Sequence, residues 1–187
     1  MRSLINLRKP VVAAANGLGV GIGATLHLHC DIVYACDNAQ IQYPFVKLAL
    51  CPEFASSILL PSVVGWQRAA ELFLLGEPCP AQTAYAWGLV NKVFAPQDTL
   101  SSAISAAHRF AQILPESVLV TRSLMRDRFT PDMTDQFELE LEHFRERLSS
   151  PEAKEAFKAF AERRPPDFSP FQHCGKNGDR TDRAYGV

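Results

Sequence analysis

The pattern of apolar and polar positions divides the chain into a first half of short mixed elements and a second half of longer helices. Short apolar runs bounded by turn residues predict buried strands at 11–15, 31–35, 39–43 and 89–94. Helical spacing of apolar residues predicts short helices at 24–29, 65–75 and 81–87. The segment 49–57 contains Pro52 and paired serines and is predicted to be irregular. We therefore expect an α/β first half.

The second half is predicted to be all helical. Its apolar residues recur at helical spacing and predict helices at 101–114, 117–129, 130–148 and 152–164. The third of these helices begins at Thr130-Pro131, a good start signal, and carries an apolar stripe at Met133, Phe137, Leu141, Phe144 and Leu148. From Ser169 onward the chain is polar and is predicted to be a mobile tail. We thus divide the chain into regions 1–95, 96–168 and 169–187.

Composition and charge exclude several classes of protein. The 187 residues suit one domain or one and a half, and 47% hydrophobic with 21% charged residues is ordinary for a globular protein. The net charge of −1 argues against a nucleic-acid partner. No uncharged apolar run approaches the ~20 residues of a membrane-spanning helix, and no signal peptide is recognised at the start. Five cysteines without C-x-x-C spacing predict reduced thiols and a cytoplasmic location.

Four alternating glycines, Gly17, Gly19, Gly21 and Gly23, form the first candidate site. The run from Gly19 fits G-x-G-x-x-A after a strand, and Asp37 follows roughly 20 residues later, as in dinucleotide-binding proteins. The helix between Gly23 and the next strand would be too short for an ordinary βαβ crossover, however. A tight turn without a ligand, or backbone N–H groups that face a ligand, are the alternatives.

Two further groups of residues could carry chemistry. His27 and Asp31 could share a helix face, but two ligands are too few for a metal, and His29 would point elsewhere, so structural roles are favoured. Glu53 is the one carboxylate in the apolar and hydroxyl-bearing stretch 48–57. If this loop folds inward, desolvation would raise the pKa of Glu53 toward that of a general base. An exposed loop glutamate is the alternative interpretation.

The string KPVVAAANGLGVGIGATLHLHCDIVYACDNAQIQYPFVKLALCPE resembles the crotonase superfamily, the enoyl-CoA hydratase/isomerases. The similar features are K-P-V-V-A-A-x-N-G, the G-x-G turn, C-D-I-V-Y-A and a later A-x-x-W-G-L-V-N-K-V, and they match in order and spacing to about Phe168. The resemblance implies a spiral of ββα turns followed by C-terminal helices that build homotrimers or hexamers. It also implies that the family has roughly 80–100 more residues before this segment, the scale of a small domain.

The resemblance further implies an acyl-CoA ligand, no separate cofactor or metal, and a thioester enolate held by two backbone N–H groups. One of these groups belongs to the residue after Gly21, here Ile22. Hydratases of the family carry two glutamates, at the positions of Thr25 and Phe45 in this chain. Neither residue can act as a carboxylate, so simple hydration is disfavoured.

The stretch YPFVKLALCPEFASS resembles the peroxisomal-type Δ3,Δ2-enoyl-CoA isomerases, which have Pro-Phe and then S-P-E-G-x-S-S. Glu53 falls on the catalytic glutamate of that motif. The resemblance thus implies an isomerase of fatty-acid β-oxidation, in which Glu53 moves a proton from C2 to C4. Cys51 replaces the serine and Phe54 replaces the glycine, and Phe54 could reshape the acyl pocket.

Two positions in the C-terminal helices complete the expected site. The resemblance places Phe144 and Arg163 where the family contacts the CoA adenine and phosphates. Core packing for Phe144 and a solvated helix end for Arg163 are the alternatives. At the level of function, three alternatives to the isomerase stay open: a non-catalytic acyl-CoA-binding relative, an enoyl-CoA hydratase, and a nicotinamide-dependent enzyme.

Overall fold

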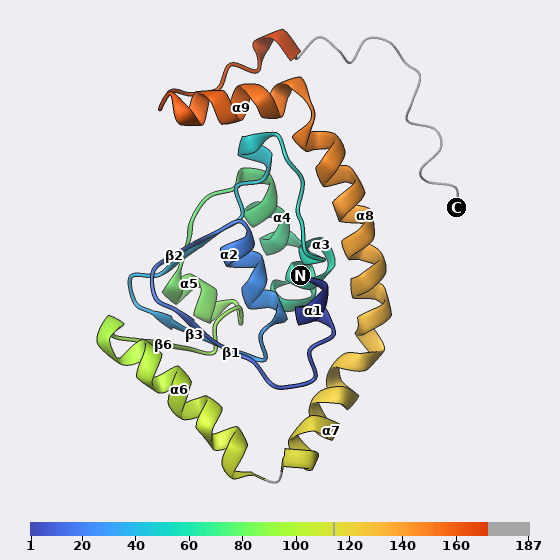
Figure 1. Ribbon diagram of the computed structural model, residues 1–187. Coiled ribbons are helices and arrows are strands. Elements are labelled where there is room, and N and C mark those ends of the chain that lie inside the picture. The colour runs from blue at the N-terminus through green and yellow to red at the C-terminus, as the bar shows by residue number, and fades with distance from the viewer. Residues whose placement is uncertain (114, 172–187) are drawn as a thin grey trace.

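The computed structural model describes residues 1–113 and 115–171 as a core of two small sheets enclosed by helices (Figure 1). The tail predicted at 172–187 lies outside the described residues, as does Cys174. The segment 169–171, also assigned to the tail, forms a short 3-10 helix, η4 (Ser169–Phe171). Long helices flank the core on two sides, and the last helix crosses one end of it.

The first four strands alternate between two sheets, the fifth joins the sheet of the fourth, and the sixth joins the sheet of the third. In the first sheet β1 (Val12–Ala15), β3 (Ile32–Cys36) and β6 (Lys92–Phe94) are all parallel, with β3 in the middle. In the second, β2 (Leu18–Val20) runs parallel to β4 (Gln40–Gln42), and β5 (Cys79–Pro80) is antiparallel to β4. In the first two units, which begin with β1–β2 and with β3–β4, the two strands enter different sheets before the chain turns into a helix, so each unit adds one turn to a spiral. The predicted fold class is confirmed.

Helices fill the remainder of the described chain, and their bounds are α1 (Arg2–Ile5), α2 (Ile22–Thr25), η1 (Leu26–His29), η2 (Val46–Leu48), α3 (Ser56–Val64), α4 (Trp66–Leu75), α5 (Ala81–Ala86), α6 (Pro96–Gln112), α7 (Pro115–Arg126), η3 (Asp127–Phe129), α8 (Thr130–Leu148) and α9 (Pro151–Ala161). Helix α6 packs on β1 and β3, whereas α8 lies against α1 and α3 (Figure 1). The C-terminal helices therefore reach back over the segment that holds the candidate base.

Several element predictions were wrong or incomplete, and the short strand β5 was not predicted. Helix α3 was missed because its sequence, SSILLPSVV, has apolar residues on all sides and contains Pro61. Strand β2 lies within the glycine segment, which was predicted to be only a turn. Helix α6 begins at Pro96, five residues before the prediction, since a proline is well tolerated in the first turn of a helix.

The core has two main parts. The larger cluster joins the two sheets to α4 and α5. A smaller one, built from Ile5, Phe54, Ala55, Met133 and Phe137, joins α8 to the chain just after Glu53. Met133 and Phe137 belong to the predicted stripe of α8, and both are buried. This packing holds the start of α3 against α8.

Candidate active site

Glu53 lies in the short connection between η2 and α3, where the backbone is unusual. Phe54 and Ala55 follow it with φ of 62° and 56°, the left-handed region that L-residues disfavour by roughly 1–2 kcal/mol each. Both residues are buried. Two consecutive left-handed residues turn the chain sharply into α3 and leave the Glu53 side chain facing inward.

The carboxylate of Glu53 has one bonded oxygen and one free oxygen. Thr25 Oγ1 donates to Glu53 Oε1 over 2.6 Å, while Glu53 Oε2 is buried and has no hydrogen-bond partner among the described residues. Burial raises the pKa of Glu53, the hydrogen bond from Thr25 opposes that rise, and the nearby Glu140 charge adds to it. The loop that carries Glu53 therefore folds inward, as the general-base hypothesis requires.

Glu53 borders a cavity of about 360 Å³ with mostly apolar walls. Its walls include side chains from β2, α2, η2 and α8, among them Val20, Ile22, Phe45, Leu48, Phe137 and Phe144. Glu53 is the one ionisable side chain among the residues that line it. Among the side chains that line the cavity, Glu53 is therefore the proton acceptor, and most of its neighbours there are apolar.

The predicted site residues fall into three groups. Gly21, Ile22, Phe45, Phe54 and Phe144 line the cavity together with Glu53. Thr25 is fully buried behind Glu53 and reaches it through the hydrogen bond. Arg163 is exposed after the end of α9, with φ of 53°, and is not part of the cavity wall.

The glycine turn presents a backbone N–H at the cavity. Gly21 has φ 55° and ψ −118°, its N–H donates to Gln42 O over 3.0 Å, and its carbonyl accepts from Ala24 and Thr25. Ile22 is the first residue of α2, where an N–H has no acceptor within the helix. In the described chain the Ile22 N–H donates to no protein atom. It is therefore available to a ligand oxygen.

Two residues hold the loop that carries Glu53: Glu140, which sequence reasoning missed, and His29, for which it favoured a structural role without indicating the contact. Glu140, on α8 and 5% exposed, accepts from Ala55 N over 2.5 Å and from Ser57 N over 2.9 Å. Burial raises the pKa of Glu140. On the other side of the loop, His29 lies with its Nε2 2.7 Å from Phe54 O. No local signal could have found these contacts, because the partners are 25 to 85 residues apart in the chain.

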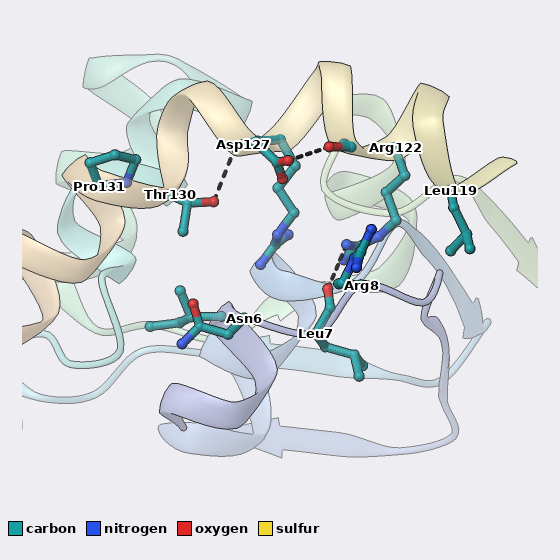
Figure 2. A pocket seen from close by; sticks show the side chains of 11 residues that line it. Asn6, Leu7, Arg8, Leu119, Arg122, Asp127, Thr130 and Pro131 are labelled. Atoms are coloured by element: carbon teal, nitrogen blue, oxygen red, sulfur yellow. Dashed lines mark hydrogen bonds between the residues drawn. The ribbon is translucent and has the colours of Figure 1, made fainter. Parts of the chain in front are cut away.

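A second cavity, of about 320 Å³, lies between the chain after α1 and the α7–α8 junction (Figure 2). Arg122 extends into it and donates through Nη1 to Leu7 O over 2.6 Å, while its Nε pairs with both Asp31 oxygens at 2.9 Å. Arg126 also lines this cavity. These contacts fasten α7 to the core.

The geometry does not fit the dinucleotide or metal hypotheses. Helix α2 is only four residues long, and β2, the strand that leads into it, lies in a different sheet from β3, which follows it. The glycines therefore do not open the long helix that a dinucleotide-binding βαβ unit places after its first strand. Asp37 is exposed in the turn after β3. Within residues 1–113 and 115–171, no group of three His, Cys, Asp or Glu side chains could hold a metal ion. None of the helices in that part of the chain is long and apolar enough to cross a membrane.

A spiral of ββα turns, with one carboxylate and a glycine turn at an apolar cavity, agrees with the class of protein that handles acyl-CoA thioesters. The family model for enoyl-CoA hydratase/isomerase matches residues 1–170, and the chain belongs to that family.

Relatives within the family are named for different activities. The chain is 34% identical over 166 residues to enoyl-CoA delta isomerase 2 of Rattus norvegicus, a match that covers 88% of this chain and 42% of that protein. It is 34% identical over 171 residues to enoyl-CoA hydratase ACTT3 of Alternaria alternata, covering 90% of this chain and 57% of that one. The chain thus spans about half the length of these relatives.

A solved structure confirms the fold. The enoyl-CoA hydratase/isomerase of Pseudoalteromonas atlantica T6c superposes with a TM-score of 0.87 at 37% identity, over 89% of this chain and 67% of that one.

Proposed function

We propose that this site shifts the double bond of a 3-enoyl-CoA to give the 2-trans-enoyl-CoA, with Glu53 as the only proton carrier. The observation that carries the proposal is the apolar cavity lined by one ionisable side chain. Isomerisation needs one group that removes a proton and returns it, because the substrate loses and regains the same number of protons.

The mechanism follows from the positions of two groups. The thioester oxygen accepts from the Ile22 N–H, and Glu53 Oε2, the oxygen without a partner, removes a proton from C2. The C2–H electrons move into the C1–C2 bond, and negative charge spreads to the thioester oxygen. The charge then returns through the carbon chain, and Glu53 delivers its proton to C4. Thr25 holds Oε1 throughout and keeps Oε2 directed at the substrate.

The apolar walls support isomerisation over hydration. Adding water to a double bond requires a base for the water and an acid for carbon. By the resemblance, Thr25 and Phe45 replace the two carboxylates of the family's hydratases. Thr25 is fully buried and Phe45 is buried, and in the proposed reaction Phe45 helps to keep water from the enolate. An enoyl-CoA hydratase therefore remains the second candidate only because relatives bear that name.

The acyl-CoA substrate also needs a place for its nucleotide part, and no further cofactor is proposed. Phe144 borders the cavity and could contact the adenine. Arg163 lies outside the cavity wall and is exposed, which suits a contact to phosphates at the surface.

We also propose a homotrimer or hexamer in the cytoplasm. The described C-terminal helices expose large apolar side chains, with Leu124 76% and Phe160 77% exposed, and such surface is commonly covered in assemblies. The four cysteines in the described chain are free thiols, which suits a reducing compartment. Light scattering coupled to gel filtration gives the number of subunits, and a monomer would refute the proposed assembly.

The deciding experiment compares Glu53→Gln with wild type in converting a 3-enoyl-CoA to the 2-trans isomer. We expect the variant to lose 10²- to 10⁴-fold in kcat, the usual contribution of a general base, and to bind the CoA thioester as before. Glu77→Gln is the matched control, because Glu77 is exposed, pairs with Lys47 and does not line the cavity. A Glu53→Gln variant with wild-type kcat would refute the assignment of the base. Hydration of a 2-enoyl-CoA without isomerisation would favour the second candidate.

A further inference from the structure

The turn after Glu53 needs contacts to hold it in place. Phe54 and Ala55 are both left-handed, and residues other than glycine adopt such a conformation only when their surroundings enforce it. Glu53 directly precedes this pair, so the direction of its carboxylate depends on the pair. Glu140 binds the N–H side of the turn, at Ala55 and Ser57. The carbonyl side of the turn has a different partner.

That partner is His29, a fully buried residue at the end of η1. Its Nε2 lies 2.7 Å from Phe54 O. A carbonyl oxygen can only accept, so His29 Nε2 carries the proton and donates. The imidazole also stacks on the Phe54 ring, with ring centroids 3.9 Å apart and an interplanar angle of 22°. His29 thus binds both the backbone and the side chain of the residue that follows the base.

Arg126 fixes the state of the imidazole. Arg126 Nη2 lies 3.4 Å from His29 Nδ1, and Nη1 lies 3.4 Å from the His29 carbonyl oxygen. A guanidinium can only donate, so Nδ1 is the acceptor and the ring is neutral. Burial lowers the pKa of His29 to about 4, and the Arg126 charge acts in the same direction. The donor to Phe54 is therefore present across the neutral pH range.

We propose that His29 is a positioning residue, which aims the Glu53 carboxylate by holding the Phe54 carbonyl from the side opposite Glu140. The proposal rests on the proposed function in taking Glu53 as the base. His29 does not line the cavity and so has no contact with the substrate. His29 therefore affects the reaction only by holding the turn that follows Glu53.

Two amide substitutions test the two ring nitrogens of His29 separately. In His29→Gln the side-chain amide nitrogen reaches approximately the position of Nε2 and can still donate to Phe54 O. In His29→Asn the shorter side chain puts its amide near Nδ1, next to Arg126, and leaves Phe54 O without its donor. Both variants are polar and neutral, and both lose the ring stacking. They differ chiefly in whether the side chain can donate a hydrogen bond to Phe54 O.

We expect His29→Gln to keep kcat within about threefold of wild type. His29→Asn should lower kcat by about 10- to 100-fold, since a misplacement of about 1 Å can cost that much, with KM changed by less than about threefold. Val90→Ala controls for lost stability, because Val90 is buried between α5 and β6, away from the cavity. A loss of kcat in Val90→Ala at equal loss of stability would overturn the proposal.

A measurement without substrate makes the test independent of turnover. The ¹³C signal of the Glu53 carboxyl carbon, followed with pH, reports how strongly burial raises the pKa of Glu53. In His29→Asn the released turn admits water, so the titration moves to lower pH, whereas His29→Gln titrates like wild type. If both variants match wild type in kcat and in titration, or if both are equally impaired, the proposal is wrong. A wild-type protein without isomerase activity would refute the proposed function, and the titration would then still decide the role of His29.

Discussion

Replacing Thr25 with valine removes the hydroxyl that holds the candidate base and keeps a side chain of nearly the same shape. Thr25 is fully buried, and its Oγ1 lies 2.6 Å from Glu53 Oε1 and 3.4 Å from Ile22 O. A hydroxyl has a single proton to donate, and the shorter contact to the carboxylate receives it. The variant therefore removes one hydrogen bond from the ionised form of Glu53.

The size of the effect follows from that bond. A hydrogen bond to a charged group contributes about 1.5–3 kcal/mol. The bond favours the ionised carboxylate, so its loss strengthens proton binding by roughly 10- to 100-fold, at 1.36 kcal/mol for each factor of ten. The pKa of Glu53, which burial already raises, should rise further in Thr25→Val. The base must be ionised to remove a proton, so the acid limb of the kcat/KM profile should move to higher pH.

The assay is the pH dependence of 3-enoyl-CoA isomerisation, measured for both proteins, with the ¹³C titration of Glu53 as a direct check. Stability gives a third measure. A carboxyl group whose pKa is raised by folding stabilises the folded state fully below its ordinary value of 4.5 and loses that contribution as pH rises through the folded pKa. The Tm deficit of Thr25→Val should therefore be larger at pH 8 than at pH 4. An acid limb that stays in place or moves to lower pH would refute this account.

Three other substitutions test residues that hold the site and the surrounding helices in place. Gly21→Ala should destabilise the fold by about 1–3 kcal/mol in urea and lower kcat more than KM, because φ 55° with ψ −118° suits only glycine; unchanged stability would contradict this. Asp31→Asn leaves the guanidinium of Arg122, 8% exposed, without its carboxylate, and should cost about 3 kcal/mol, read from the urea midpoint; a loss below 1 kcal/mol would count against it. Glu140→Leu strands two buried N–H groups and should cost roughly 2–4 kcal/mol, whereas Glu140→Gln should recover part of that loss; equal losses in both would show that packing alone matters.

Local motifs identify part of the cavity wall from the sequence. The glycine turn at Gly21 and the Pro-Phe pair that ends at Phe45 are short segments whose backbone geometry follows from their own residues. Both line the cavity with Glu53, as expected from the resemblance. The role of Arg163 could not be judged in this way, because it depends on where the end of α9 lies relative to the rest of the fold. The structure leaves it exposed and outside the cavity wall.

The missed helix shows where local pattern is insufficient. Helix α3 contains Pro61 and has little contrast between its faces, so its own residues predict it weakly. Its start is stabilised by the Glu140 carboxylate, which lies 85 residues from Ala55 in the chain. Tertiary contacts of this kind override intrinsic propensity, and no local window contains them.

The residues alone indicated the family, the mixed core with its helical second half, and Glu53 as the candidate base. The mixed core and the helical second half follow from short-range chemistry, which is the periodicity of apolar side chains and the turn residues. The family and the role of Glu53 came from the resemblance of several motifs. Whether Glu53 is buried, which of its oxygens is free, and how its loop is held depended on Thr25, His29 and Glu140. These are properties of the folded chain, because desolvation and hydrogen bonding at one residue are set by whichever distant segments pack around it.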